Sequence, residues 1–191
     1  AMGVSIPILP VTDDRLRTIV DTSDGPLDFQ TYFVHQHCEP VVTGLRFEGA
    51  SAAVLFPSIS TALADPDLTA VILCPSNPFL SLDPILATAD LRCRLQDCVA
   101  PVVAVSPMVG SKAFKGPTAK IMQELGHAPT TLSVARYYAA LLDGYVIDTA
   151  DAEISDEIEE FGLRVKTAGT LMDSLEQKQR LAADVVAFSE T

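Results

Sequence analysis

The chain has 191 residues, of which 48% are hydrophobic and 20% are charged, and its formal net charge is −12. This composition is typical of a globular protein with a hydrophobic core, and the length predicts one domain of ordinary size, or one domain with an embellishment. The acidic balance argues against nucleic acid or an anionic membrane as the main partner, and no apolar run is long enough to span a bilayer.

The sequence of residues 1–49 predicts a small region of strands with one helix. Residues 17–21 alternate between apolar and polar positions, as a half-buried strand does, and residues 41–47 form a second strand candidate. Residues 27–37 are ambiguous, because their aromatic content suits a strand while their apolar spacing suits a helix. We favour a helix here, with Asp28 as its N-cap.

From residue 50 onward, strands alternate with helices. The predicted strands are residues 69–74, 102–105, 144–147 and 163–166. The predicted helices are residues 59–64, 82–87, 91–97, 117–126, 133–142, 156–161 and 172–188, with caps at Ser81, Asp90 and Ser133. This alternation predicts a Rossmann-like α/β fold, a mainly parallel sheet with helices on both faces, in which residues 50–191 are the α/β portion.

The first of these strands ends in a polar turn. Residues 69–74 are apolar at consecutive positions, which predicts a strand covered on both faces, and Pro75 ends strand pairing. Ser76, Asn77 and Pro78 then form the turn. Because ligands bind at the carboxyl ends of strands in open α/β sheets, the turn is a candidate ligand-binding loop. The alternative is an ordinary connection in which Ser76 and Asn77 are turn formers and helix caps.

A second candidate follows the strand at residues 102–105. The stretch 106–116 is the most basic part of an acidic chain, and it contains Gly110, Ser111, Lys112, Lys115 and Gly116. Glycines allow the backbone to approach a phosphate closely, and lysine supplies positive charge. The spacing is not that of a P-loop. The alternative is a solvated loop with ordinary surface lysines.

Asp13, Asp14 and Arg15 form a third candidate. Adjacent carboxylates can share Mg²⁺, which prefers a few hard oxygen ligands together with phosphate oxygens. The alternative is a capped turn with a surface ion pair.

His35, His37 and Cys38 resemble metal ligands in type, but no fourth ligand lies near them in the sequence, so we predict no metal site there. The four cysteines of the chain have no CxxC spacing. We therefore expect reduced thiols in a cytoplasmic protein.

Six stretches, in order and spacing, resemble successive motifs of the 2-phospho-L-lactate transferase family (LPPG:Fo 2-phospho-L-lactate transferases of coenzyme F-420 biosynthesis): residues 8–15, 29–34, 74–78, 105–110, 115–117 and 143–148. The most specific are Pro75-Ser76-Asn77-Pro78 and Lys115-Gly116-Pro117. The resemblance implies transfer of a 2-phospho-L-lactyl or phosphoenolpyruvyl group from a guanosine-diphosphate-activated donor to a hydroxyl of the deazaflavin Fo. The products would be GMP and the F-420 precursor, and the family requires Mg²⁺.

Within this resemblance, Ser76 and Asn77 are expected to contact the nucleotide or its phosphates. Lys112 and Lys115 are expected to neutralise the donor diphosphate. Asp13 and Asp14 are assigned either to a structural turn or to the outer shell of the metal.

The chain also departs from the family pattern. The first Gly-rich turn and the early acidic residues of the family have no counterpart, so roughly the first third of the family's length is expected to be missing, with residues 1–49 bridging to it. The catalytic residues and the Mg²⁺ ligands would lie in that part. We therefore expect a C-terminal portion that is weakly active or inactive alone and that self-associates through its uncovered side. The alternatives are a nucleotide- or nucleotide-sugar-binding relative without turnover, a truncated inactive fragment, and a dimerisation fragment.

Overall fold

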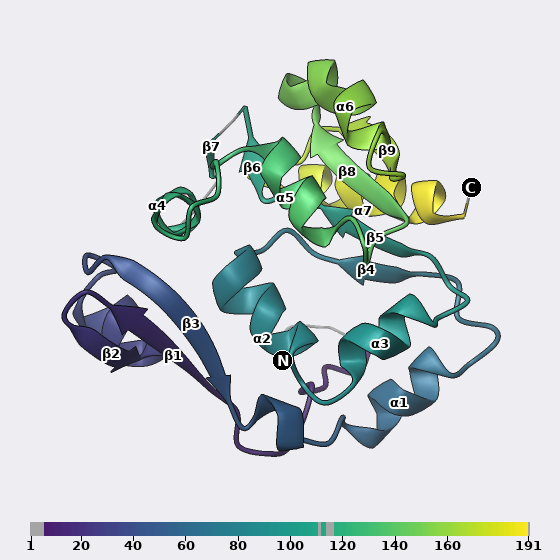
Figure 1. The fold of residues 1–191 in the computed structure, drawn as a ribbon. Coiled ribbons are helices and arrows are strands. Elements are labelled where there is room, and N and C mark those ends of the chain that lie inside the picture. The colour runs from purple at the N-terminus through teal and green to yellow at the C-terminus, as the bar shows by residue number, and fades with distance from the viewer. Residues whose placement is uncertain (1–5, 111, 114–116, 191) are drawn as a thin grey trace.

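The computed structural model describes residues 6–110, 112–113 and 117–190 (Figure 1). Its centre is a four-stranded sheet in the order β4-β5-β8-β9, and all three strand pairs are parallel. The strands are β4 (Val71–Leu73), β5 (Val102–Val105), β8 (Gly144–Asp148) and β9 (Arg164–Ala168). Every residue of the two central strands, β5 and β8, is buried. The predicted Rossmann-like α/β fold is therefore confirmed.

Helices cover both faces of this sheet. On one face, Val103 and Val105 of β5 pack in a cluster with Leu181 and Val185 of α7 (Leu175–Ser189). On the other face, the alternate residues Val102 and Ala104 belong to the larger core, which includes buried residues of five further helices. These are α2 (Asp83–Leu86), α3 (Leu91–Gln96), α4 (Thr118–Glu124), α5 (Thr131–Tyr138) and α6 (Ser155–Glu159), while α1 (Pro57–Leu63) packs against the core with partly buried residues. No helix in the described part of the chain is long and apolar enough to cross a bilayer.

The strand β4 differs from its prediction. It lies at the edge of the sheet and pairs only with β5 among the described strands. Its residues are only partly buried, and Ile72 is 37% exposed. A consecutive apolar run therefore marked an edge strand here, because the run reports hydrophobic surroundings but not the order of the strands.

An antiparallel sheet forms an arm beside the α/β core, at the lower left of Figure 1. Its order is β2-β1-β3, with β1 (Arg17–Thr22), β2 (Gly25–Asp28) and β3 (Val42–Glu48). The helix predicted from about Asp28 is confirmed from Phe29 onward, because residues 29–35 are helical and Thr31–His35 form a π-helical turn. Asp28 itself is the last residue of β2 and not the cap of that helix. Pairing with β1 keeps the first part of this segment extended.

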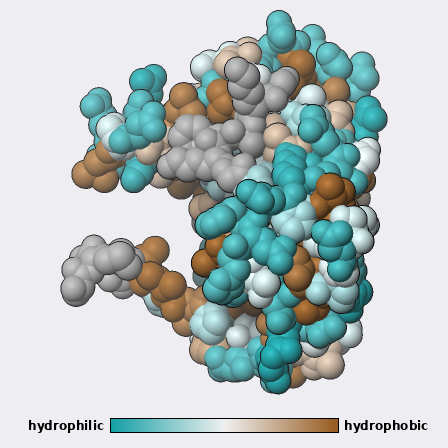
Figure 2. Space-filling model, turned by 90° about the vertical axis from the view of Figure 1, so that its left-hand side faces the viewer, coloured by the Kyte–Doolittle hydropathy of each residue, from teal (hydrophilic) through white to brown (hydrophobic). Residues whose placement is uncertain are grey.

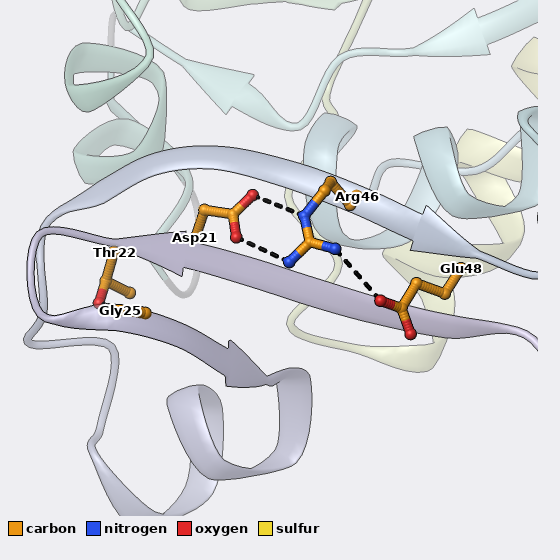
Figure 3. A network of polar contacts seen from close by, with 5 residues as sticks. All are labelled: Asp21, Thr22, Gly25, Arg46 and Glu48. Carbon is orange, nitrogen blue, oxygen red and sulfur yellow. Dashed lines mark hydrogen bonds and ion pairs between the residues drawn. The ribbon is translucent and has the colours of Figure 1, made fainter.

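Polar contacts on the arm are shown in Figure 3. Arg46 donates to both carboxylate oxygens of Asp21, at 2.9 and 3.0 Å, and to Glu48 at 3.1 Å. The Arg46 guanidinium lowers the pKa of Asp21. The Thr22 hydroxyl donates to the Gly25 carbonyl at 2.7 Å and closes the hairpin turn. Solvent screens the ion pairs, so they favour the strand register without contributing much to stability.

The arm is anchored to the α/β core through α4. The Lys120 ammonium donates to the Pro40 carbonyl at 2.8 Å, and the Glu124 carboxylate accepts from the Val42 amide at 3.0 Å. Lys120 and Glu124 also form an ion pair at 2.6 Å. Two backbone groups of the arm are thus bound to a charged pair on one helix, which fixes the arm relative to the core.

Two predicted helix caps, Ser81 and Ser133, are wrong. Asp90 is at the N-cap position of α3, as predicted, but its side chain makes no capping hydrogen bond. The helical segment before α2 begins earlier and is capped by Asn77. Thr130 caps α5, and its hydroxyl accepts from the Ser133 amide at 3.1 Å. The Asp90 carboxylate accepts from Arg94 at 2.8 Å instead of capping. The errors at Ser81 and Ser133 each shift a helix start by a few residues, as expected where several capping residues are close together.

Candidate functional site

A pocket of about 570 Å³ lies where the parallel strands end. Its lining residues come after β4 (Pro75, Ser76, Asn77), after β5 (Ser106, Pro107, Val109) and after β9 (Thr170, Met172). Further residues come from the arm, the segments around α2 and α4, and α7: Phe29, Phe33, Leu80, Ser81, Pro117, Thr118 and Lys178. The carboxyl ends of parallel strands are the usual ligand site in open α/β sheets, so this pocket is the candidate site.

The predicted residues Ser76 and Asn77 both line the pocket. The Asn77 side-chain oxygen accepts from the amides of Phe79 and Leu80, at 3.0 and 2.9 Å, and so caps the helical turn that follows. Its amide nitrogen donates to the Thr118 hydroxyl at 3.1 Å. Asn77 therefore connects two lining segments and keeps one N–H for a ligand. The Ser76 hydroxyl makes no hydrogen bond within the described residues, so it is free to bind a ligand.

Thr170 is held in the pocket wall by the buried carboxylate of Asp148, at the end of β8. Asp148 accepts from the amide and the hydroxyl of Thr170, at 2.8 and 2.9 Å, and from the Ala150 amide at 2.9 Å. Burial alone would raise the pKa of Asp148, but these hydrogen bonds together lower it. Asp148 thus stays ionised and positions Thr170, although it does not itself line the pocket.

Lys178 of α7 is the only charged side chain among the described residues that line the pocket. It is exposed and makes no ion pair within the part of the chain that the structure describes. A lysine without a protein partner, on the wall of a pocket rich in hydroxyl groups, favours an anionic ligand.

The basic stretch after β5 forms a small two-stranded sheet, β6 (Met108–Val109) with β7 (Lys112–Ala113). The Gly110 amide donates to the buried carboxylate of Asp151 at 3.0 Å, and Gly110 does not line the pocket. The predicted binding residues Ser111, Lys115 and Gly116 lie outside the described residues, and only the backbone of Lys112 is described. The predicted residue Pro78 is buried and does not line the pocket.

Asp13, Asp14 and Arg15 are exposed and do not line the pocket. The Asp14 carboxylate accepts from the Val54 amide at 2.7 Å, and the Thr12 hydroxyl accepts from the Asp14 amide at 3.0 Å. Asp14 therefore takes part in a turn that joins the N-terminal segment to the chain before α1. Across the described residues, no three His, Cys, Asp or Glu side chains are grouped so that they could hold a metal ion together.

A partly buried carboxylate, that of Asp83, supports the segment that follows Asn77. Asp83 is 12% exposed at its side chain and accepts from the hydroxyls of Tyr137 and Tyr138, at 2.7 and 3.0 Å. The Tyr138 hydroxyl also lies 3.0 Å from the Pro78 carbonyl. Burial raises the pKa of Asp83, against the lowering effect of the two tyrosines and of Arg92, whose guanidinium is 3.9 Å away. This network ties α5 to the turn after Asn77.

The raised pKa of Asp83 predicts a pH dependence of stability. A carboxyl whose pKa is higher in the folded state stabilises the fold fully below its unfolded value, about 3.9, and this contribution is lost as the pH rises through the folded value. The free energy of unfolding of the wild type minus that of Asp83→Asn should therefore fall as the pH rises from about 4 toward neutrality. Urea unfolding at a series of pH values measures this, with the exposed Glu159→Gln as a control for the lost charge. A difference that rises with pH would contradict the assignment.

The parallel sheet with a pocket at its strand ends defines an α/β protein with a candidate ligand site. The chain belongs to the 2-phospho-L-lactate transferase family, because the family model described as 2-phospho-L-lactate transferase CofD matches residues 1–187. The family that the motifs predicted is thereby confirmed.

Individual relatives agree with this family. The chain is 35% identical over 189 residues to the 2-phospho-L-lactate transferase of Methanosarcina barkeri, covering 99% of this chain and 60% of the relative. It is 40% identical over 152 residues to the 2-phospho-L-lactate transferase of Halobacterium salinarum, covering 80% of this chain and 44% of the relative. Two crystal structures of a Bacillus halodurans protein of the UPF0052 family share the fold. The first has a TM-score of 0.56 and 11% sequence identity, and the match covers 91% of this chain and 60% of the other. The second has a TM-score of 0.57 and 9% identity, and the match covers 93% of this chain and 61% of the other. The chain thus spans about 60% of the length of the Methanosarcina relative.

Several pocket residues were missed by the sequence interpretation: Phe29, Phe33, Thr118, Thr170, Met172 and Lys178. Thr170 and Met172 follow the fourth predicted strand, so applying the strand-end rule to that strand as well would have found them. Lys178 lies within a helix predicted from its apolar spacing, and nothing in the local sequence distinguishes it from the other exposed charges of α7.

Proposed function

We propose that this chain is part of a transferase that moves a 2-phospho-L-lactyl or phosphoenolpyruvyl group from a guanosine-diphosphate-activated donor to Fo. The acceptor hydroxyl would attack the phosphorus atom that carries the acyl group. The new O–P bond replaces the bond to GMP, which leaves as the hydroxyl loses its proton. The observation that carries the proposal is the pocket at the strand ends, with its hydroxyls, amide and lysine, in a member of this family.

The pocket residues suit the positioning and charge neutralisation that phosphoryl-type transfer requires. The Ser76 hydroxyl and the remaining Asn77 N–H are available to phosphate oxygens. Lys178 supplies positive charge, and we retain Lys112 and Lys115 as further partners of the diphosphate. Mg²⁺ remains a proposed cofactor, and no step is assigned to it because the described residues offer no cluster of ligands.

A chimera tests this function. Residues 6–190 would replace the matching 60% of the Methanosarcina barkeri relative, and GMP formation from Fo and the activated donor would be measured with MgCl₂. We expect the chimera to form GMP, and the isolated chain to bind GDP with little or no turnover. A folded chimera that binds GDP but forms no GMP would favour the alternative, a nucleotide-binding relative without turnover.

Lys178→Ala is expected to weaken GDP binding by about fivefold to tenfold, because a charge-assisted contact to the diphosphate is lost. Lys178→Arg should retain most of the affinity, since it keeps the charge. Isothermal titration calorimetry at physiological ionic strength measures both. The exposed Lys166 of β9 does not line the pocket, so Lys166→Ala is the matched control. Equal losses in the Lys178 and Lys166 variants would indicate a general charge effect and contradict the role of Lys178.

Self-association and a cytoplasmic location also remain proposals. The unpaired side of β4, with Ile72 37% exposed, is a surface that a second copy could cover. On the face shown in Figure 2, hydrophilic residues divide the brown hydrophobic surface into several patches. This face therefore does not favour one large apolar interface, and β4 is the better candidate for the contact.

A further inference from the structure

Two aromatic side chains of the arm, Phe29 and Phe33, line the pocket. Their ring centroids are 5.4 Å apart and their planes are inclined by 28°, so the rings are stacked on each other. Phe33 nevertheless remains 43% exposed. A stacked pair with a free ring surface toward a pocket is an unusual feature in a chain in which only 6% of the residues are aromatic.

Packing of the neighbouring residue keeps this pair out of the core. Tyr32 is fully buried, and its hydroxyl donates to the Cys38 carbonyl at 3.3 Å. The Lys120 ammonium lies 5.9 Å from the centre of the Tyr32 ring. Tyr32 therefore takes the inward position of this turn. Because α4 also anchors the arm at Pro40 and Val42, Phe29 and Phe33 are held at the pocket instead of collapsing into the core.

We infer that Phe29 and Phe33 form an aromatic wall that stacks against the planar heterocycle of a substrate. The inference rests on the proposed function, whose two substrates each carry such a ring, the deazaflavin of Fo and the guanine of the donor. Stacking on an aromatic side chain stabilises a bound planar ring and tolerates either chemistry. The rest of the described lining is rich in hydroxyl groups and carries Lys178, so it suits phosphates and sugar hydroxyls better than a ring.

Met172 supports the same division of the pocket. Met172 also lines the pocket, and a methionine sulfur makes favourable contacts with aromatic edges. A planar ring on the aromatic wall would thus meet an adaptable apolar side chain, while the groups attached to it reach the polar part of the pocket.

The test uses the whole 191-residue chain, the double variant Phe29→Ala/Phe33→Ala, and Phe33→Leu. Leucine keeps the apolar volume without the planar ring. If the double variant does not fold, the affinities of Phe33→Leu therefore test whether the ring itself is needed for binding. Val34→Ala is the matched control, because Val34 is adjacent and 51% exposed but does not line the pocket. Dissociation constants would be measured for Fo, for GDP, and for riboflavin, a planar tricyclic probe with no part in the proposed reaction.

We expect the double variant to weaken binding of Fo and riboflavin by about tenfold or more, with GDP and the Val34→Ala variant unaffected. Such a result assigns the wall to the acceptor ring, whereas a loss for GDP alone assigns it to the guanine base. If riboflavin alone binds the wild type, and its binding is lost in the variants, the wall is supported while the proposed function fails. If the wild type binds Fo and GDP, and the double variant binds both with unchanged affinity, the inference is overturned while the proposed function stays intact. A wild type that binds none of the three ligands overturns both.

Discussion

Asn77→Ala is expected to lower the free energy of unfolding by about 3 kcal/mol and to weaken GDP binding. The alanine cannot accept from the Phe79 and Leu80 amides, and the loss of a helix cap costs about 1 to 2 kcal/mol. The Thr118 hydroxyl, in a residue only 3% exposed, also loses its partner, which costs about 1 to 3 kcal/mol. Urea unfolding measures the stability, and calorimetric titration measures the affinity for GDP.

Asn77→Asp separates the structural role from the ligand contact. One carboxylate oxygen can accept from the same two amides and the other from the Thr118 hydroxyl, so the stability should stay within about 1 kcal/mol of the wild type. The added negative charge in the pocket should still weaken GDP binding by about tenfold. Unchanged GDP affinity in Asn77→Asp would show that no phosphate lies near this side chain.

Gly49→Ala should destabilise the fold by about 3 kcal/mol. Gly49 joins β3 of the arm to the α/β core and has a φ of +86°, a conformation that costs a non-glycine residue about 1 kcal/mol or more. A β-carbon at this position would also collide with the backbone carbonyl oxygen of Arg15. Because that obstacle is backbone, relief requires a shift of the chain, which adds about 1 to 3 kcal/mol.

Gly126→Ala is the matched control for this prediction. Gly126 has a similar φ of +81°, but a β-carbon there would meet nothing within 4 Å, so only the conformational cost of about 1 kcal/mol is expected. Urea unfolding of both variants measures the difference, which reports the collision with Arg15. Equal destabilisation of the two variants would mean that the junction between the arm and the core adjusts without cost.

The central part of the fold was predictable from local sequence. Residues 102–105 and 144–147 are apolar at consecutive positions, and both became strands buried on two faces. Residues 69–74 have the same pattern and formed an edge strand, because periodicity does not report strand order. The short strand Gly25–Asp28 was missed for a related reason, since its pairing with β1 is not visible in its local pattern, whereas the helix that follows it was predicted.

Some residues of the candidate site were likewise predictable from local sequence, and others were not. Ser76 and Asn77 were predicted because they directly follow a strand, and the structure places both in the pocket lining. The cap role of Asn77 was one of the alternatives that the sequence offered, and it depends on the nearby amide of Phe79. The hydrogen bond from its side-chain nitrogen to Thr118, 41 residues away, was not predictable. Phe33 and Lys178 come from the arm and from α7, so only long-range packing brings them to one wall.

The sequence by itself determined the α/β class, the buried central strands, the polar turn that follows β4 and the family. These depend on residue type, on short-range periodicity and on motif order, which the chain carries directly. Only the tertiary structure decided which strand lies at the edge, that Asn77 contacts Thr118, and that Phe29 and Phe33 line the pocket. The physical reason is that these features arise from contacts between segments far apart in the chain, whose free energies no local pattern contains.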